Sequence, residues 1–463
     1  MKIAILNGSP KGDQSVTMQY ILYIKKKIPK HEYKILNVAQ QIKRLEKNDE
    51  AFQDILNEIQ NADAIIWGFP LYVMAIASQF KRFIELIFEK NVMSYFKDKY
   101  TMLLLTSIHF FDHTAKNYMH GICDDLEMKV VDYYSADSWD LLYPKRRAMW
   151  LKIAENFFEA IENKIPTSRQ YPSINPREFE YHPEGFKNGE KKVNPGHKKV
   201  LIITDSQDES ENLGKMIKIF QTCFSQEIEV INIYDIDILG GCIGCGKCGY
   251  NHECSYTGKD GYQEFWEEHV MKADILVFAG SIKDRFLSSR WKMVYDRAFY
   301  QTHTPTLIGK QLGFIISGPL SQIPNLKEMM QAHVEIQMSN LGGIVTDEYG
   351  DSAEIDALLY DLARRLIKFA DINIIKPQTF LGVGGFKIFR DDVYGRNRFV
   401  FLADHKWYEE HGVYDSFPQN DQRAIEMNKK LIPLIQIDKI RNKMDFREEF
   451  LKPFKKVITD PNK

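Results

Sequence analysis

The sequence predicts two doubly wound α/β domains in tandem, each with a five-stranded parallel sheet, followed by a C-terminal extension. Three observations lead to this fold class. Short β-branched runs alternate with helical patterns along most of the 463 residues, a length that suits two or three domains. Runs such as 64–67 and 102–105 are apolar at every position, which is typical of parallel strands covered on both faces. The whole pattern also occurs twice.

The repeat can be read directly from the letters. Residues 2–9 resemble residues 199–206 at an offset of 197. An offset of 211 relates three further pairs of segments: 62–68 and 273–279, 78–85 and 289–296, and 99–107 and 310–318. The second occurrence has therefore gained 14 residues between its first and third strands. Most of this gain is the cysteine-rich segment Cys242–Cys254.

The repeat and the proline pattern set the expected boundaries. We expect a first region at 1–165, a linker at 166–198, a second region at 199–375 and an extension at 376–463. The linker contains five prolines and little periodicity, which predicts an ordered or semi-rigid connection. In the first region we expect strands near 2–7, 33–38, 63–68, 101–106 and 129–133. The helices are expected near 15–28, 48–60, 77–90, 113–126 and 146–163.

Composition excludes several classes of function. A net charge of −2 gives no general attraction to nucleic acid or to an anionic membrane. The most hydrophobic window, 62–80, is interrupted by Gly68 and Pro70, which argues against a membrane span. The chain enters a strand at its second residue, so we expect no signal peptide and a cytoplasmic location. In that setting six cysteines favour metal or redox chemistry over disulfides.

The loop after the first predicted strand has the residues of a phosphate site. Gly8 and Gly12 permit tight turns, and the following helix contributes free amides and the positive end of its dipole. The side chains predicted to bind phosphate are Ser9, Lys11, Ser15 and Thr17. The alternative is an ordinary turn with Ser15 as the helix cap.

Two further loops should lie on the same sheet edge, since ligands of such sheets sit beyond the carboxyl ends of the strands. Both could contact a flat aromatic ring, although a strand-to-helix turn with a buried Tyr72 is the alternative. Together the three loops suit flavin mononucleotide (FMN). The residues predicted to contact the ring are Pro70, Leu71, Tyr72, Val73, Met74, Ser107, His109 and Phe110. His109 is also the predicted catalytic proton donor.

Four cysteines form the second predicted site. The spacing C-x2-C-x2-C-x5-C places the thiols of Cys242, Cys245, Cys248 and Cys254 in one compact loop. Intervening glycines let backbone amides point at sulfur, as in iron–sulfur proteins. Structural zinc usually uses two separate C-x2-C pairs, which a shared middle cysteine prevents. Zinc and free thiols remain the alternatives to an iron–sulfur cluster.

The flavin loops resemble those of the NADPH-dependent FMN reductase family, which has a flavodoxin-like fold and binds FMN. The cysteine spacing resembles that of the iron–sulfur flavoproteins, a branch of this family that carries FMN and a 4Fe-4S cluster on one domain and dimerises. This chain departs from that pattern because its first region lacks the cysteines. The phosphate loop of its second region instead has four acids, Asp205, Asp208, Glu209 and Glu211. The resemblance therefore implies a fused pseudo-dimer in which a cluster on the second region serves FMN on the first.

The functional hypothesis is an oxidoreductase that passes electrons between NAD(P)H, or a ferredoxin-like donor, and an acceptor that the sequence leaves open. An electron carrier or redox sensor with the same cofactors is the alternative, and a zinc-stabilised interaction protein is a third. The expected partners are a small-molecule or ferredoxin-like donor and acceptor, and a second copy of the chain in a homodimer. A flavin edge covered by the extension would favour the carrier.

Overall fold

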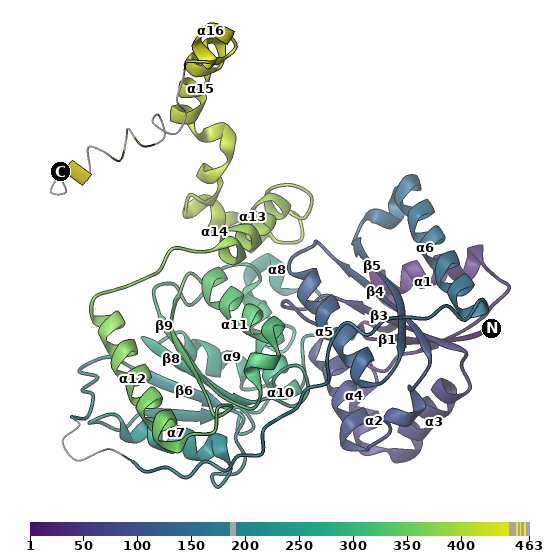
Figure 1. Ribbon diagram of the computed structural model, residues 1–463, viewed down its shortest axis with the longest axis horizontal. Helices are drawn as coiled ribbons and strands as arrows, with labels where there is room; N and C mark the ends of the chain where they lie inside the picture. The colour runs from purple at the N-terminus through teal and green to yellow at the C-terminus, as the bar shows by residue number, and fades with distance from the viewer. Residues whose placement is uncertain (186–190, 444–450, 452–453, 455–457, 460–463) are drawn as a thin grey trace. The chain divides into compact units, whose positions relative to one another are not determined.

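The computed structural model describes residues 1–185, 191–443, 451, 454 and 458–459. Contacts divide these residues into two compact units, Met1–Asp404 and His405–Lys463. The first unit contains two five-stranded, all-parallel sheets with helices on both faces (Figure 1). The predicted fold class is confirmed.

The first sheet has the strand order β2-β1-β3-β4-β5. The strands are β1 (Lys2–Asn7), β2 (Glu32–Leu36), β3 (Ala64–Pro70), β4 (Tyr100–Ser107) and β5 (Lys129–Asp137). The helices of this region are α1 (Val16–Lys27), α2 (Ile42–Lys47), α3 (Asp49–Gln60), α4 (Ser78–Glu89), α5 (Asp112–Asp125) and α6 (Pro144–Glu162). The sequence missed the short helix α2 and placed the end of β5 four residues early.

The second sheet has the corresponding order, β7-β6-β8-β9-β10. Its strands are β6 (Val200–Thr204), β7 (Glu229–Asn232), β8 (Ile275–Ser281), β9 (Gln311–Ser317) and β10 (Asn340–Thr346). The main helices are α7 (Asn212–Thr222), α10 (Ser289–Ala298), α11 (Pro324–Ile336) and α12 (Ser352–Asp371). Between β7 and β8 lie the short helices α8 (Cys248–Asn251) and α9 (Tyr262–Glu264), and a π-helical turn at Phe265–Val270 follows α9.

Equivalent elements of the two sheets begin at a constant spacing. The starts of β3 and β8, of β4 and β9, of β5 and β10, and of α4 and α10 are each separated by 211 residues. Each sheet also buries one apolar face under an equivalent pair of helices, α1 with α6 in the first region and α7 with α12 in the second. The 211-residue offset found in the sequence is therefore also the offset between equivalent folded elements.

The two regions meet through helices of the opposite faces. Helix α4 packs on α10, and α5 contacts α11. The linker does not act as a spacer in its described part. Tyr181 is completely buried in the second core, and its hydroxyl bonds the carboxylate of Asp356.

The extension begins inside the first unit with α13 (Phe380–Tyr394), which packs on α11. Helix α14 (Leu402–Glu410) spans the division between the units, and the second unit contains α15 (Gln422–Ile435) and α16 (Asp438–Arg441). Among the described residues, no helix has both the length and the apolar content needed to cross a membrane.

Candidate functional site

The three loops predicted to bind a flavin lie at one edge of the first sheet. The amide of Leu71, after β3, donates to the carbonyl of Thr106 in β4 at 3.0 Å. Thr17, in the first turn of α1, shares a hydrogen bond with the Thr106 hydroxyl at 2.7 Å. These two bonds hold the loop after β1, the loop after β3 and the end of β4 together.

The loop after β1 forms a compact cradle at the start of α1. Gly12 has a φ of +57°, and a Cβ there would lie 2.5 Å from the Gln40 side chain, so this turn requires glycine. Ser15 caps α1 by accepting from the amide of Met18 at 3.2 Å, which is the structural role considered above. Its hydroxyl proton and the amides of Val16 and Thr17 remain as donors, because a helix start leaves its first amides without internal partners.

The four predicted phosphate ligands differ in whether their hydroxyl or ammonium groups are free to donate to a phosphate. Ser9 and Thr17 are completely buried, and the Ser9 hydroxyl accepts from the amide of Lys11 at 3.2 Å. The Thr17 hydroxyl is used by Thr106, so Thr17 positions α1. Within the described ranges, Lys11 forms no salt bridge with any carboxylate, so its ammonium group is available for an anion.

The loop after β3 contains a strained two-residue turn. Tyr72 and Ala75 exchange backbone hydrogen bonds of 2.7 and 3.0 Å, which forces the two residues between them to positive φ, +39° at Val73 and +64° at Met74. A β-branched residue rarely adopts such a φ, and strain of this kind clusters at ligand sites.

The carbonyls of Tyr72 and Met74 in this turn accept side-chain hydrogen bonds, whereas two of its amides have no acceptor among the described residues. The Met74 carbonyl accepts from the Thr114 hydroxyl at 2.5 Å, and the Tyr72 carbonyl accepts from the Lys292 ammonium at 2.8 Å. No residue in the described part of the chain accepts a hydrogen bond from the amides of Val73 and Met74. Since buried amides in proteins are nearly always paired, and Met74 is 4% exposed, these two amides are suited to a ligand.

The loop after β4 places His109 beside a carboxylate. Its Nδ1 lies 2.9 Å from Asp112 Oδ2, which also accepts from the Ser135 hydroxyl. The hydrogen bond with Asp112 raises the pKa of His109. Burial raises the pKa of Asp112, but bonds from His109 and Ser135 outweigh burial and lower it to about 2. His109 therefore holds a proton on Nδ1 and has Nε2 for exchange.

Phe110, the last predicted ring contact, lies under the extension. The amide of His109 is tied to Ser107 Oγ at 2.9 Å. The ring of Phe110 is 4.1 Å from that of Phe389 in α13, and Arg396 makes two bonds of 2.8 Å to Asp137. The first part of the extension thus contacts the flank of this loop.

The cysteine loop of the second region packs against the first region's turn. A Cβ on Gly244, whose φ is +63°, would lie 2.1 Å from the Tyr72 hydroxyl oxygen. The carbonyl of Cys242 accepts from the Gln79 side chain at 3.1 Å. Burial, with Cys242 next in magnitude, raises the pKa of Tyr72. No sequence pattern predicted this contact between the two predicted sites.

The four thiols are neighbours but are not arranged as a metal centre. Among the described residues, no group of three or more His, Cys, Asp or Glu side chains could hold a metal ion. Cys245 is exposed and lies 2.8 Å from Ser255 Oγ, and Cys248 is buried. Burial, with smaller contributions from neighbouring cysteines, raises the pKa of both Cys242 and Cys248 to about 12. The amide of Gly244 donates to Cys242 Sγ at 3.4 Å.

At the carboxyl edge of the second sheet, the chain's own polar groups bond to one another. The carboxylate of Asp347, after β10, accepts from the Ser317 hydroxyl at 2.7 Å, the Gly318 amide at 2.8 Å and the Asn212 side chain at 2.9 Å. Asn212 begins α7, where Ser15 stands in the first region by the 197-residue offset. Its side chain also donates to the carbonyl of Phe179 in the linker at 2.9 Å. The first residue of α7 is thus tied to an internal carboxylate through its side chain.

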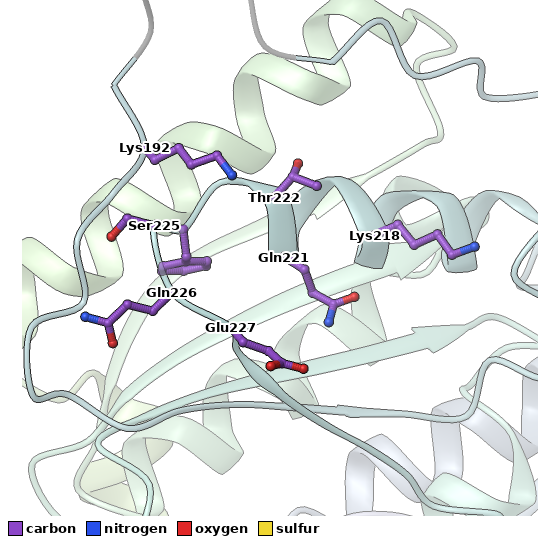
Figure 2. A pocket seen from close by; sticks show the side chains of 8 residues that line it. Lys192, Lys218, Gln221, Thr222, Ser225, Gln226 and Glu227 are labelled. Carbon is purple, nitrogen blue, oxygen red and sulfur yellow. The ribbon is translucent and has the colours of Figure 1, made fainter.

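A separate surface hollow lies at the other end of α7, away from this edge (Figure 2). It contains none of the predicted site residues. Its lining is Lys192, Lys218, Gln221, Thr222, Phe224, Ser225, Gln226 and Glu227.

One comparison with known proteins, that with family models, agrees with the fold of the first region. The sequence model of a family with a flavodoxin-like fold matches residues 1–157. A comparison with curated proteins found no match. Similar solved structures include FerB, a flavoenzyme NAD(P)H:(acceptor) oxidoreductase from Paracoccus denitrificans, at 15% identity over 35% of this chain and 97% of that one, with a TM-score of 0.29. An NAD(P)H:quinone oxidoreductase from Methanothermobacter marburgensis is 14% identical over 37% of this chain and 99% of that one, with a TM-score of 0.27.

Proposed function

We propose that the chain is an FMN-dependent NAD(P)H oxidoreductase with its flavin at the carboxyl edge of the first sheet. The turn Tyr72–Ala75 carries this proposal. Two of its amides have no acceptor among the described residues and can donate to a ligand, and the turn lies beside a phosphate cradle. Bound FMN would supply the transfer of hydride and single electrons. The matched family fold over residues 1–157 supports the same assignment.

Different residues at this edge would bind the phosphate and the ring of FMN. The hydroxyls of Ser9 and Ser15, the ammonium of Lys11 and the first amides of α1 suit a terminal phosphate. The amides of Val73 and Met74 suit the polar edge of the ring. His109, oriented by Asp112 at 2.9 Å, can donate a proton at that edge.

For the second region we propose a 4Fe-4S cluster on Cys242, Cys245, Cys248 and Cys254. The chemistry of the donors supports this proposal, because four thiols share one loop and the Gly244 amide donates to Cys242 Sγ. Since the thiols are not arranged as a metal centre, the loop would have to bring them together to hold a cluster. Metal binding would require these thiols to lose their protons. A cluster would supply one-electron transfer. Since Gly244 lies against the Tyr72 hydroxyl, we propose that this loop exchanges electrons with FMN on the first region.

The test is to purify the protein without oxygen and to measure iron, sulfide, zinc and FMN per chain. About four irons and one FMN are expected for one cubane cluster and one flavin site. Zinc in place of iron, or two flavins, would contradict the division between the regions. Cys242→Ser should remove iron, whereas Cys123→Ser, at a buried thiol outside the loop, should not. If Cys242→Ser removed iron but left flavin reduction by every donor unchanged, the electron path would be wrong.

One observation favours the second candidate, an electron carrier. The packing of Phe389 on Phe110 at 4.1 Å puts the extension against a predicted ring contact. The two functions differ in steady-state turnover. An enzyme reduces small acceptors at the expense of NAD(P)H, whereas a carrier exchanges electrons only with redox proteins. The homodimer stays a prediction, which light scattering would test.

A further inference from the structure

The helices at the contact between the two regions form a pseudo-symmetric set of buried ion pairs. Lys81 in α4 lies 2.8 Å from Glu85, and Lys292 in α10 forms the equivalent pair with Asp296. Both pairs have the spacing i, i+4, and the two lysines are 211 residues apart. All four side chains are at most 7% exposed.

Each acid of this set also binds the start of the opposite helix. Glu85 accepts from the amide of Ser289 at 2.6 Å, and Asp296 accepts from the amide of Ser78 at 2.7 Å. A carboxylate at a helix N-terminus is favourable because it pairs with free amides and the helix dipole. The two halves of the contact are therefore built from the same residues in the same roles.

The symmetry ends at the second partner of each lysine. Lys81 donates to the carboxylate of Asp284 in the loop after β8, at 2.8 Å. Lys292 donates to the backbone carbonyl of Tyr72 in the loop after β3, also at 2.8 Å. Each ammonium thus crosses to the other region, but Lys81 binds a side-chain carboxylate there, whereas Lys292 binds the backbone carbonyl that leads into Val73 and Met74.

We propose that Lys292, supplied by the second region, is a positioning residue for the flavin-ring turn of the first region. This inference rests on the proposed FMN site. A buried ammonium bound to the Tyr72 carbonyl fixes the peptide that leads into Val73 and Met74, and both of those residues are held at positive φ. Without this bond the turn can relax to ordinary backbone angles, and the two amides lose the positions that these φ values give them. The first region's site is therefore complete only when the second region is folded against it.

The experiment compares Lys292→Met with Lys81→Met in the full chain. Lys292→Met leaves the buried Asp296 without its ammonium, and Lys81→Met leaves Asp284 without its ammonium while Glu85 keeps Arg82 at 3.1 Å. Because Lys81 loses contacts with two acids and Lys292 with one, Lys81→Met is the stricter control for general effects on folding. The readouts are the FMN dissociation constant, the absorption spectrum of bound FMN, and hydrogen exchange of the flavin-free protein. Because a charge-assisted bond is lost, Lys292→Met should weaken FMN binding about tenfold or more and change the spectrum. Lys81→Met should change the affinity by less than about twofold, since it touches no flavin loop.

Hydrogen exchange separates this inference from the proposed function. In flavin-free protein, Lys292→Met should speed exchange at residues 72–75, and Lys81→Met should speed exchange at 282–287. Equal changes in FMN affinity in both variants, or none in either, would overturn the positioning role. A wild-type chain that binds no FMN would instead overturn the proposed function, while the exchange comparison would still decide what Lys292 holds. If Lys292→Met does not fold, Lys292→Gln and Lys81→Gln form the replacement pair, with the same criteria.

Discussion

The two sheets of this chain have the same strand order and spacing, but their carboxyl edges have opposite chemical character. The first region leaves hydrogen-bond donors without acceptors, namely the amides of Val73 and Met74 and the first amides of α1. The corresponding edge of the second region contains the carboxylate of Asp347, which accepts three hydrogen bonds. One edge is suited to an anion and the other already contains one. A shared fold therefore does not imply a shared site.

The loops after β3 and β8 extend this comparison. In the first region the loop after β3 is held through a backbone carbonyl, that of Tyr72. In the second region the side chain of Asp284 is drawn into the contact by Lys81 and by the Tyr118 hydroxyl, at 2.8 and 3.1 Å. The loop after β8 thus uses its carboxylate to hold the two regions together.

The largest expected effect is the loss of stability when the ion pair between Asp284 and Lys81 is removed. Asp284→Ala would leave Lys81 buried with one partner in place of two, and removing one member of a buried ion pair costs about 3–5 kcal/mol. The main thermal transition should fall by roughly 6–20 °C for a domain of this size, as measured by calorimetry. Asp208→Ala is the control, because Asp208 is an exposed acid of the same region. Equal shifts in the two variants would mean that the ion-pair set does not stabilise the contact.

The next effect concerns the proton donor of the first edge. His109→Ala should lower NAD(P)H-dependent turnover by about a hundredfold, the lower range for a general acid, with FMN content unchanged. His113→Ala is the matched control, because His113 bonds Glu328 of the second region at 2.8 Å and should alter turnover by less than about threefold. Similar losses in the two variants would remove His109 from the mechanism.

The pH dependence of turnover tests the same residue. Asp112 raises the pKa of His109, so protonated His109 persists above its ordinary pKa of about 6.5. Turnover should fall as pH rises through the raised pKa, and Asp112→Asn should move that fall to lower pH. The stability from this pair has the same sign: it is fully present below the unfolded pKa and is lost as pH rises through the folded one. A pH profile unchanged by Asp112→Asn would contradict the assignment.

The sequence predicted the fold well because its signals are local. Continuous apolar strands and a repeated spacing of 211 residues are properties of the letters, and the folded elements keep that spacing. The three flavin loops could be placed together for a similar reason, since the carboxyl ends of parallel strands meet at one edge. Glycine at position 12 was a recognisable sign of a tight turn.

Contacts between the regions could not be predicted in this way. Lys292 is an ordinary helical lysine in the sequence, and only packing brings it to Tyr72. The repeat does contain a signal for the two ion pairs. The aligned segments 78–85 and 289–296 both contain Lys at their fourth position and an acid at their eighth. Asp347 was also missed. The expectation of an altered second site relied on four nearby acids, and Asp347 comes from a different strand end.

A smaller effect is expected when the phosphate cradle itself is distorted. Gly12→Val would impose a side chain at φ +57° and 2.5 Å from Gln40, and left-handed backbone costs about 1–2 kcal/mol. FMN binding should weaken about tenfold, as measured by flavin fluorescence. Gly309→Val is the control, because Gly309 has a φ of +79° with no atom within 4 Å of its Cβ position. Comparable losses in both variants would indicate general destabilisation.

The smallest effect concerns the contact between the extension and the carboxyl edge of the first sheet. Arg396 binds Asp137, while Glu348, 211 residues further along, instead accepts from the amide of Ser321 at 2.7 Å. Arg396 is 39% exposed, so Arg396→Ala should cost less than about 1 kcal/mol. It should nevertheless speed hydrogen exchange in α13 and the release of FMN, because α13 packs on Phe110. If α13 loosens but FMN release is unchanged, the extension does not cover the flavin edge, and the carrier loses its supporting observation.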